Sequence, residues 1–291
     1  MTDHHSVILD AFGAPLESDN PDDIVAISEH VLSLEGAVAE RPGNTLSYTE
    51  KVEMLRALDE LERRKDYAGH LRFFPDEGPY SYDKYVKHIQ FLAYGATKRE
   101  RVFMAGNRVG KSIAGGYEMA CHLTGMYPHW WTGRRFFTAT DCWASGDTGQ
   151  TTRDIVQAKM LGDNADWGTG MIPRDCIVDV RMRPGGGGAV DLVRVRHTSG
   201  QISKLGFKSY DQKRRAFQGT QKHAIWLDEE PPIEVYGECL MRTAKTGEFV
   251  GGIVYVTFTP LQGITPFVQE FLNATEIARE IQRDRETGST E

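Results

Sequence analysis

The chain has 291 residues, 40% of them hydrophobic and 26% charged, which is typical of a globular protein with one large α/β domain and an appendage, or with two small domains. Its formal net charge of -7 at pH 7 excludes a uniformly basic nucleic-acid-binding protein but leaves room for a local basic face. No run approaches the roughly 18 uninterrupted apolar residues of a membrane span, and the N-terminus lacks the basic and apolar regions of a signal peptide.

The cysteines are widely spaced and form no CxxC pair: Cys121, Cys142, Cys176 and Cys239. This spacing favours neither a structural zinc site nor a disulfide framework. A reducing, cytoplasmic setting is therefore expected.

The N-terminal segment is strongly acidic. Residues 1–42 contain nine Asp or Glu residues and a single basic residue, Arg41. Such a composition is typical of a solvated, partly ordered arm, and residues 24–34 can form a short helix within it. The alternative is a docking segment for a basic partner. We therefore separate residues 1–45, as an acidic N-terminal arm, from the folded domain.

Residues 46–80 are predicted to form a helical lead-in to that domain. Ser47 and Glu50 make a capping box, and apolar residues then recur every three positions, which predicts a helix over 48–67. A second helix is predicted over 82–94. It carries Gln90, whose amide can both donate to and accept from the edge of an adenine, or is simply solvated.

The central motif lies in residues 101–112, which read RVFMAGNRVGKS. A short apolar run precedes a Gly-containing turn and the start of a helix, the layout of a phosphate-binding loop, although Ala105 replaces the first Gly of the full pattern. Backbone N–H groups of residues 106–111 can wrap a phosphate, and Gly110 allows close approach. Lys111 would reach the β- and γ-phosphates, and Ser112 would ligate Mg²⁺.

Helices and strands alternate after this loop. We expect a helix over 113–123, a strand over 134–140, and a loop followed by a helix over 141–159. Residues 168–188 read as irregular, and residues 190–207 as a β-hairpin. Nine basic residues make the next region either a charged surface or a contact for phosphates: Arg181, Arg183, Arg194, Arg196, Lys204, Lys208, Lys213, Arg214 and Arg215.

An apolar strand over 223–227 ends in Asp228 and Glu229. Together with the upstream phosphate-binding loop, this is the second half of a P-loop ATPase site. Asp228 would hold the water shell of Mg²⁺, and Glu229 would polarise the attacking water. A third apolar strand over 252–258 brings Thr259 to its tip, where a hydroxyl can sense the γ-phosphate, and a last helix is expected over 267–283.

Taken together, these motifs resemble one family, the ATPase domain of the large terminase subunit, the motor that packages DNA into tailed-phage capsids. The loop from Gly106 to Ser112 is similar to the family's deviant loop, which tolerates a missing first Gly and carries an Arg inside. The resemblance covers roughly residues 80–275 and also rests on four runs: FKSYDQ at 207–212, FQGT at 217–220, IWLDEEPP at 225–232 and TFTPLQG at 257–263.

The resemblance implies an α/β fold, that of a P-loop NTPase of the additional-strand catalytic-glutamate (RecA-like) class. A mostly parallel central sheet would be flanked by helices and preceded by a helical N-terminal extension. The ATPase domain would span residues 46–275, and residues 276–291 would be the helix end and linker. Too few residues follow Thr259 for the family's RNase H-like nuclease domain, so no nuclease activity is expected from this chain.

The resemblance also implies a role for each site residue. Glu229 would be the catalytic carboxylate, with Lys111 and Arg108 acting on the phosphates, and Ser112 and Asp228 would hold the metal. Thr259 would couple hydrolysis to motion. An arginine from a neighbouring subunit would complete the site, with Arg214, Arg215 and Arg242 as candidates. The implied nucleotide-binding set is Gln90, Gly106, Asn107, Arg108, Val109, Gly110, Lys111, Ser112 and Thr259.

The implied function is ATP-driven translocation of double-stranded DNA into a procapsid, with ATP and Mg²⁺ as cofactors. The implied partners are double-stranded DNA, the capsid portal protein, the small terminase subunit and further copies of the chain, usually five in a ring, while free subunits are often monomeric. The implied location is the host-cell cytoplasm, docked transiently on the procapsid.

Two other functions stay open. A helicase-like DNA translocase would need a second RecA-like domain or further helicase motifs, and neither is evident. A nucleotide-switched assembly module would bind ATP mainly to order a contact with a capsid or portal partner. Stimulation of ATP turnover by an assembled partner separates the motor from the switch. A P-loop kinase is disfavoured because it does not need the Asp-Glu strand end.

Overall fold

The computed structural model describes residues 51–52, 54–58, 67–164, 166–185, 187–247 and 249–273. The acidic arm and the linker over 276–291 lie outside the described residues, as do parts of the helices predicted over 48–67 and 267–283. The described portions of these two helices, residues 51–52, 54–58 and 266–273, are helical, as predicted. No described helix is both long enough and apolar enough to cross a membrane.

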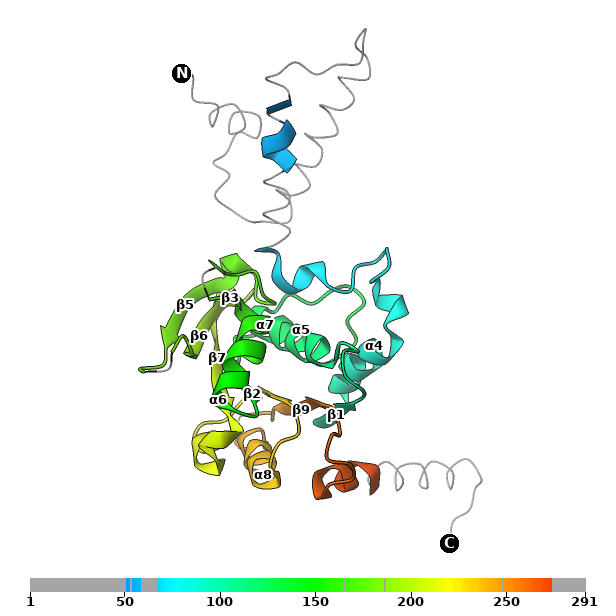
Figure 1. Ribbon diagram of the computed structural model, residues 1–291, viewed down its shortest axis with the longest axis vertical. Coiled ribbons are helices and arrows are strands. Elements are labelled where there is room, and N and C mark those ends of the chain that lie inside the picture. The colour runs from blue at the N-terminus through cyan, green and yellow to red at the C-terminus, as the bar shows by residue number, and fades with distance from the viewer. Residues whose placement is uncertain are drawn as a thin grey trace, which may run out of the picture.

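A seven-stranded sheet organises the described part of the chain, in the order β1-β9-β8-β2-β7-β6-β5 (Figure 1). The first five strands of this order run parallel, and β6 and β5 continue the sheet antiparallel. A separate pair joins β3 (Gly162–Asp163) and β4 (Asp166–Trp167). The strands of the main sheet are β1 (Glu100–Met104), β2 (Asp141–Gly146), β5 (Ile177–Met182), β6 (Val190–Arg196), β7 (Ile202–Ser209), β8 (Ala224–Asp228) and β9 (Ile253–Phe258).

The position of β9 decides the fold class. β1 leads into the loop at residues 105–110, and β8 ends in Asp228. β9 lies between them and is paired with both. An extra parallel strand between the loop strand and the acidic strand is the feature that defines the additional-strand class. The predicted fold is therefore confirmed.

Helices cover both faces of the sheet (Figure 1). On one face lie α4 (Val86–Ala93), α5 (Lys111–Thr124) and α7 (Ala158–Leu161), and on the other lie α8 (Ile233–Arg242) and the helix at 266–273. β8 and β9 are buried along their whole length because both of their faces are covered. The shorter helical segments are α6 (Gly149–Thr151), a π-helical segment (Thr152–Gln157) and 3-10 turns at Gly69–Arg72, Tyr82–Lys84, Tyr94–Ala96, Arg174–Cys176, Tyr210–Gln212 and Arg214–Phe217.

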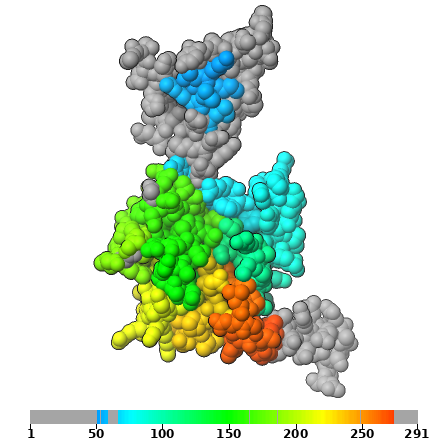
Figure 2. Space-filling view, viewed as in Figure 1, coloured from blue at the N-terminus to red at the C-terminus, as the bar shows by residue number. Residues whose placement is uncertain are grey.

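The apolar core is divided by the sheet into two clusters. Trp226 of β8 points into the cluster under α5, whereas its neighbours Ile225 and Leu227 point into the cluster under α8. In the second cluster Tyr236 of α8 meets the ring of Phe267 edge-on, at 5.1 Å between centroids. Figure 2 shows this C-terminal segment, in orange, seated beside the yellow part of the chain.

The strand predicted over 134–140 is wrong, because β2 begins only at Asp141. The backbone N–H groups before it have side-chain partners instead of a neighbouring strand: Phe136 N–H donates to the Tyr127 hydroxyl, and Thr140 N–H to Ser203 Oγ. Phe136 is buried while Phe137 is 80% exposed. This alternation of buried and exposed residues is typical of a strand. The segment is nevertheless not a strand, because its N–H groups donate to side chains and not to the backbone of a neighbouring strand.

Residues 168–188 are also more regular than predicted, since they contain β5. Its backbone pairs with β6, with two register shifts along the pair. Strand-favouring residues such as Val178 and Val180 were present, but Arg181 and the glycines after it hid the pattern. The hairpin of β6 and β7 is confirmed, and helix α5 spans the helix predicted over 113–123.

Three buried histidines make the fold sensitive to acid. Burial lowers the pKa of His70, His88 and His122, so the folded chain takes up protons on these imidazoles at a lower pH than the unfolded chain does. Below the unfolded-state pKa of about 6.5 the unfolded chain binds protons that the folded chain does not, so stability falls as the pH falls. We expect the free energy of unfolding to drop by about 2 kcal/mol between pH 7 and pH 5.5. Urea denaturation at the two pH values measures this, and coincident midpoints would contradict it.

Candidate active site

The phosphate-loop sequence connects β1 to α5 at the carboxyl edge of the sheet. Gly110 precedes α5 in the left-handed region, with φ 84°, and a Cβ there would lie 3.0 Å from His88 Nε2. Arg108 also has a left-handed φ of 60°. No side chain caps the start of α5. Its first backbone N–H groups are therefore available to an anion held by the loop.

Lys111 lies inside the curl of this loop. Its side chain is buried, at 7% exposure, and its Nζ donates to the carbonyl oxygen of Gly106 at 2.6 Å. This contact spans the loop from its last residue to one of its first. The ammonium is thus held at the centre of the loop, where a bound phosphate would lie.

Asp228, at the end of β8, meets Ser112, at the start of α5. Burial raises the pKa of Asp228, and hydrogen bonds from Thr257 and Ser112 partly offset that rise. The Thr257 hydroxyl donates to Asp228 Oδ1 at 2.6 Å and itself accepts from Trp226 Nε1 at 2.8 Å. A carboxylate and a hydroxyl in contact are oxygen ligands of the kind that Mg²⁺ prefers. The side chains present fit that ion.

Glu229 follows Asp228 with a left-handed φ of 70°, unusual for a residue other than glycine. Its backbone N–H donates to Thr257 O at 2.8 Å, so the strained backbone is still tied to β9. Partial desolvation, and then the charge of Asp228, raise the pKa of Glu229 above its ordinary value. A carboxylate with a raised pKa is a better proton acceptor near neutral pH.

Asn107 of the loop and Thr259 lie just after the ends of the neighbouring strands β1 and β9. The Thr259 hydroxyl, just after β9, donates to Asn107 Oδ1 at 2.8 Å. The structure therefore brings Thr259 into direct contact with the loop. His88, whose pKa burial lowers, donates from Nε2 to the Val109 carbonyl at 2.8 Å. Arg108 is exposed on the same rim.

A cavity of about 580 Å³ opens beside the loop. It is lined by loop residues, including Arg108 and Gly110, and by aromatic residues that come before the loop in the chain. Gln90 is exposed and does not line this cavity, because it lies two residues, or about 200° of helical rotation, from His88. The adenine role of Gln90 stays a prediction. The aromatic lining consists of Phe73, Phe74, Tyr80, Tyr85 and His88.

Sequence reasoning missed His88, Phe74 and Tyr85 as site residues. A signal was present: Tyr82, Tyr85 and His88 recur every three residues before the loop, as on one helix face. The contact of Thr257 with Asp228 was also missed, because the sequence pattern pointed to Thr259 at the tip of the strand. The alternation of β9 places Thr257 on the same face as Thr259, one step deeper.

The three candidate arginines differ in their surroundings. Arg214 and Arg242 both pair with the buried carboxylate of Glu238, at 2.9 and 3.0 Å. Arg215 is exposed and forms no ion pair with another described residue. Among the three guanidinium groups, that of Arg215 is the one with no ion pair to a carboxylate in the described part of the chain.

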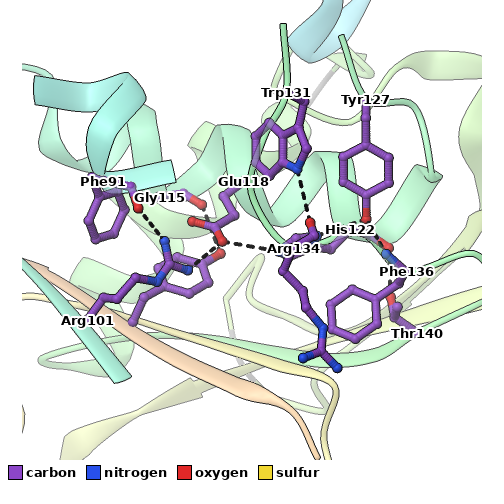
Figure 3. Close-up of polar contacts among 11 residues, drawn as sticks. Phe91, Arg101, Gly115, Glu118, His122, Tyr127, Trp131, Arg134, Phe136 and Thr140 are labelled. Atoms are coloured by element: carbon purple, nitrogen blue, oxygen red, sulfur yellow. Dashed lines mark hydrogen bonds and ion pairs between the residues drawn. The ribbon is translucent and has the colours of Figure 1, made fainter. Parts of the chain in front are cut away.

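A buried ion cluster joins the two arms of the loop behind the site (Figure 3). Arg101 of β1 donates to Glu118 Oε1 of α5 at 2.5 Å and to the Phe91 carbonyl at 2.6 Å. His122 contacts the same Glu118 oxygen at 3.2 Å. Burial, the largest single effect, disfavours the ionised Glu118. The charge of Arg101 and the contacts with His122 together outweigh burial and hold the pKa of Glu118 below its usual value. The cluster therefore ties the strand and the helix that carry the loop.

Comparisons with known proteins show the family to which the chain belongs. The family model of the terminase large subunit, T4likevirus-type, N-terminal, matches residues 102–289. The large terminase subunit of Salmonella phage P22 is 36% identical, over 79% of this chain and 47% of that protein. The solved large terminase ATPase domain of Thermus phage P74-26 has a TM-score of 0.36 and 15% identity, over 64% of this chain and 72% of that chain.

The chain spans about half the length of the Salmonella phage P22 protein that it matches. The family model, by contrast, matches more than half of this chain, from β1 through the loop, Asp228 and β9 to residue 289. The matched region contains every residue of the loop and both carboxylates of the acidic strand end. The chain therefore belongs to the family of T4likevirus-type terminase large subunits, in their N-terminal part.

Proposed function

We propose that this chain is an ATP-hydrolysing motor that drives double-stranded DNA into a procapsid. One observation carries the proposal: the hydroxyl of Ser112, from the phosphate loop, contacts the buried carboxylate of Asp228, with Glu229 next to it. A phosphate binder, a metal ligand pair and a general base thus converge at neighbouring strand ends. This combination suits nucleotide hydrolysis better than nucleotide binding alone.

Each residue then has a defined role. The amides of the loop and the Lys111 ammonium bind the phosphates, and Ser112 with Asp228 would hold Mg²⁺. When bound, this ion neutralises charge on the β- and γ-phosphates. Glu229 orients a water molecule and accepts its proton as the oxygen attacks the γ-phosphorus. The bond from the γ-phosphorus to the β–γ bridging oxygen breaks, and ADP leaves with that oxygen. Thr259, bonded to Asn107 of the loop, passes the loss of the γ-phosphate to the segment after β9.

We place the base of the nucleotide in the cavity beside the loop. Its aromatic walls, Phe74 and Tyr85 among them, offer stacking surfaces for the base. Arg108, which belongs to the loop, also lines this cavity. The resemblance also supports assembly into a ring on the portal protein, together with the small terminase subunit. In that ring we assign the cross-subunit arginine to Arg215, because Arg214 and Arg242 are both paired with Glu238.

Replacing Lys111 by alanine should weaken ATP binding about 10- to 100-fold, since a charge-assisted contact to phosphate contributes about 1.5–3 kcal/mol. Isothermal titration calorimetry of ATP with each protein measures this. Lys98→Ala, which removes a lysine on the exposed surface before β1, is the matched control and should bind as the parent does. An unchanged dissociation constant for Lys111→Ala would remove the loop from the nucleotide site.

We place the DNA contact on the outer face of the β6–β7 hairpin. Arg194, Arg196 and Lys204 are exposed there, while the alternate residues are buried in the core. Arg194 lies directly opposite Lys204, and neither forms an ion pair with another described residue. Asp179 of β5 lies opposite Arg194 on the other side and offsets part of the positive charge. With three cations and this one carboxylate, the face keeps a net positive charge. Cations spaced along a flat sheet suit a phosphate backbone.

Removing both Arg194 and Lys204 should weaken binding of duplex DNA and reduce its salt dependence. Each lost phosphate contact lowers the slope of log K against log salt by about 0.9, so the double alanine variant should lose about 2 units of slope. Fluorescence anisotropy with a duplex of mixed sequence, from 50 to 200 mM salt, gives this slope. Lys87→Ala with Lys98→Ala, an equal loss of charge beside α4 and β1, should leave it unchanged. Equal slopes for parent and hairpin variant would place the DNA elsewhere.

A further inference from the structure

The hydroxyl of Tyr210 lies against the backbone of both acidic residues. It donates to the carbonyl oxygens of Asp228 at 3.0 Å and of Glu229 at 3.1 Å. Tyr210 is 4% exposed, and burial raises the pKa of its hydroxyl well above the usual value. One buried donor therefore serves two successive carbonyl groups at the end of β8.

These carbonyl groups flank the left-handed backbone of Glu229, with φ 70°. A left-handed conformation at a residue other than glycine costs free energy and persists only where its surroundings enforce it. At Glu229 two contacts do so: its N–H donates to Thr257 O at 2.8 Å, and its C=O accepts from Tyr210. Loss of the second contact would leave the N–H bond to Thr257 as the one hydrogen bond among these two that holds the backbone of Glu229.

Tyr210 itself stands on a rigid platform. It follows β7 directly, and its N–H donates to Asp147 O, just after β2, at 3.1 Å. Ser209 and Gln212 form a capping box around it. The next residue, Asp211, accepts from Gly149 N at 3.0 Å. The hydroxyl is thus held by the ends of β2 and β7, strands that carry none of the catalytic groups.

We propose that Tyr210 is the positioning residue for Glu229: its shared hydrogen bond holds the strained backbone that aims the carboxylate at the water molecule. This inference rests on the proposed function for the catalytic role of Glu229. In the described structure, the turn at 209–212 forms no hydrogen bond with the loop or with Ser112. The inference is that this turn nevertheless contributes to the rate of hydrolysis.

Tyr210→Phe tests the proposal, with Tyr255→Phe as matched control. Tyr255 is also buried in the sheet, and its hydroxyl also donates to a backbone carbonyl, that of Gly115, at 3.0 Å. Both variants lose one buried hydroxyl bond, but only Tyr210 reaches the catalytic strand end. We expect Tyr210→Phe to lower kcat about tenfold with KM changed less than about twofold, because the hydroxyl orients the base and does not touch ATP. Tyr255→Phe should keep kcat within about twofold of the parent.

A second readout does not depend on turnover. Hydrogen–deuterium exchange of the peptide that contains Glu229 should be faster in Tyr210→Phe than in the parent, and unchanged in Tyr255→Phe, because the Glu229 N–H bond to Thr257 loosens with its neighbour. Equal exchange in both variants would overturn the positioning role, whatever the activity. An active parent whose kcat is unaffected by Tyr210→Phe would also overturn it and leave the proposed function intact. A parent without turnover would count against the proposed function, and the exchange result would still decide the contact.

Discussion

Glu118→Ala is expected to lower the free energy of unfolding by about 3–5 kcal/mol, because it leaves the Arg101 guanidinium buried without its counter-charge. Arg101 is 5% exposed and Glu118 is fully buried, so water cannot replace the lost carboxylate. The Phe91 carbonyl and the rings of Phe91 and Tyr255 remain around the cation, but none of them carries a full negative charge. Urea denaturation followed by circular dichroism measures the loss.

Two further variants sharpen this test. Glu77→Ala removes an exposed glutamate from a loop and should change stability by less than about 0.5 kcal/mol. The double variant Arg101→Met with Glu118→Leu should be more stable than Glu118→Ala alone, because it leaves no buried charge unpaired. A double variant that is less stable than the single one would show that packing, and not the ion pair, governs this position.

Glu229→Gln is expected to reduce ATP hydrolysis at least about 100-fold while ATP still binds. The amide keeps the size of the side chain but cannot accept a proton from water, whereas the raised pKa of Glu229 suits that step. Binding is preserved because the contacts to phosphate come from the loop and Lys111. Steady-state phosphate release gives the rate, and calorimetry gives the affinity.

The neighbouring carboxylate supplies the control for this prediction. Glu230 carries the same charge and takes the same change to glutamine, but its Oε1 accepts a hydrogen bond from the Thr265 hydroxyl. Glu230→Gln should therefore retain most of the turnover. Near-parental turnover in Glu229→Gln, or an equal loss in both variants, would deny Glu229 its role as the base.

Much of the site could be predicted because its residues are consecutive in the chain. The loop from Gly106 to Ser112 and the pair Asp228 and Glu229 are local patterns. Each follows a short apolar strand: β8 is buried along its whole length, and β1 is buried or half-buried over Arg101 to Phe103. Because parallel strands end at the same edge of a sheet, the loop and the two carboxylates could be expected to lie close together. The position of β9 between β1 and β8 then established the additional-strand class of the fold.

Contacts between distant segments could not be predicted in the same way. His88 reaches Val109, and Tyr210 reaches Glu229, through side chains whose direction depends on the packing of α4 and β7. Gln90, on the same helix as His88, does not line the cavity that His88 lines, and its adenine role stays a prediction. The strand predicted over 134–140 is wrong for a related reason: before Asp141, single side chains such as Ser203 accept the hydrogen bonds that a neighbouring strand would have accepted.

The central claim is that the loop after β1 and the acidic end of β8 form one hydrolytic centre. Single-turnover phosphate release tests it most directly, with the protein in excess over ATP and with Mg²⁺ either present or removed by a chelator. The account predicts conversion of ATP to ADP and phosphate that stops when Mg²⁺ is removed. ATP that binds with Mg²⁺ present and is recovered intact after prolonged incubation would contradict it, and would favour a nucleotide-switched assembly module instead.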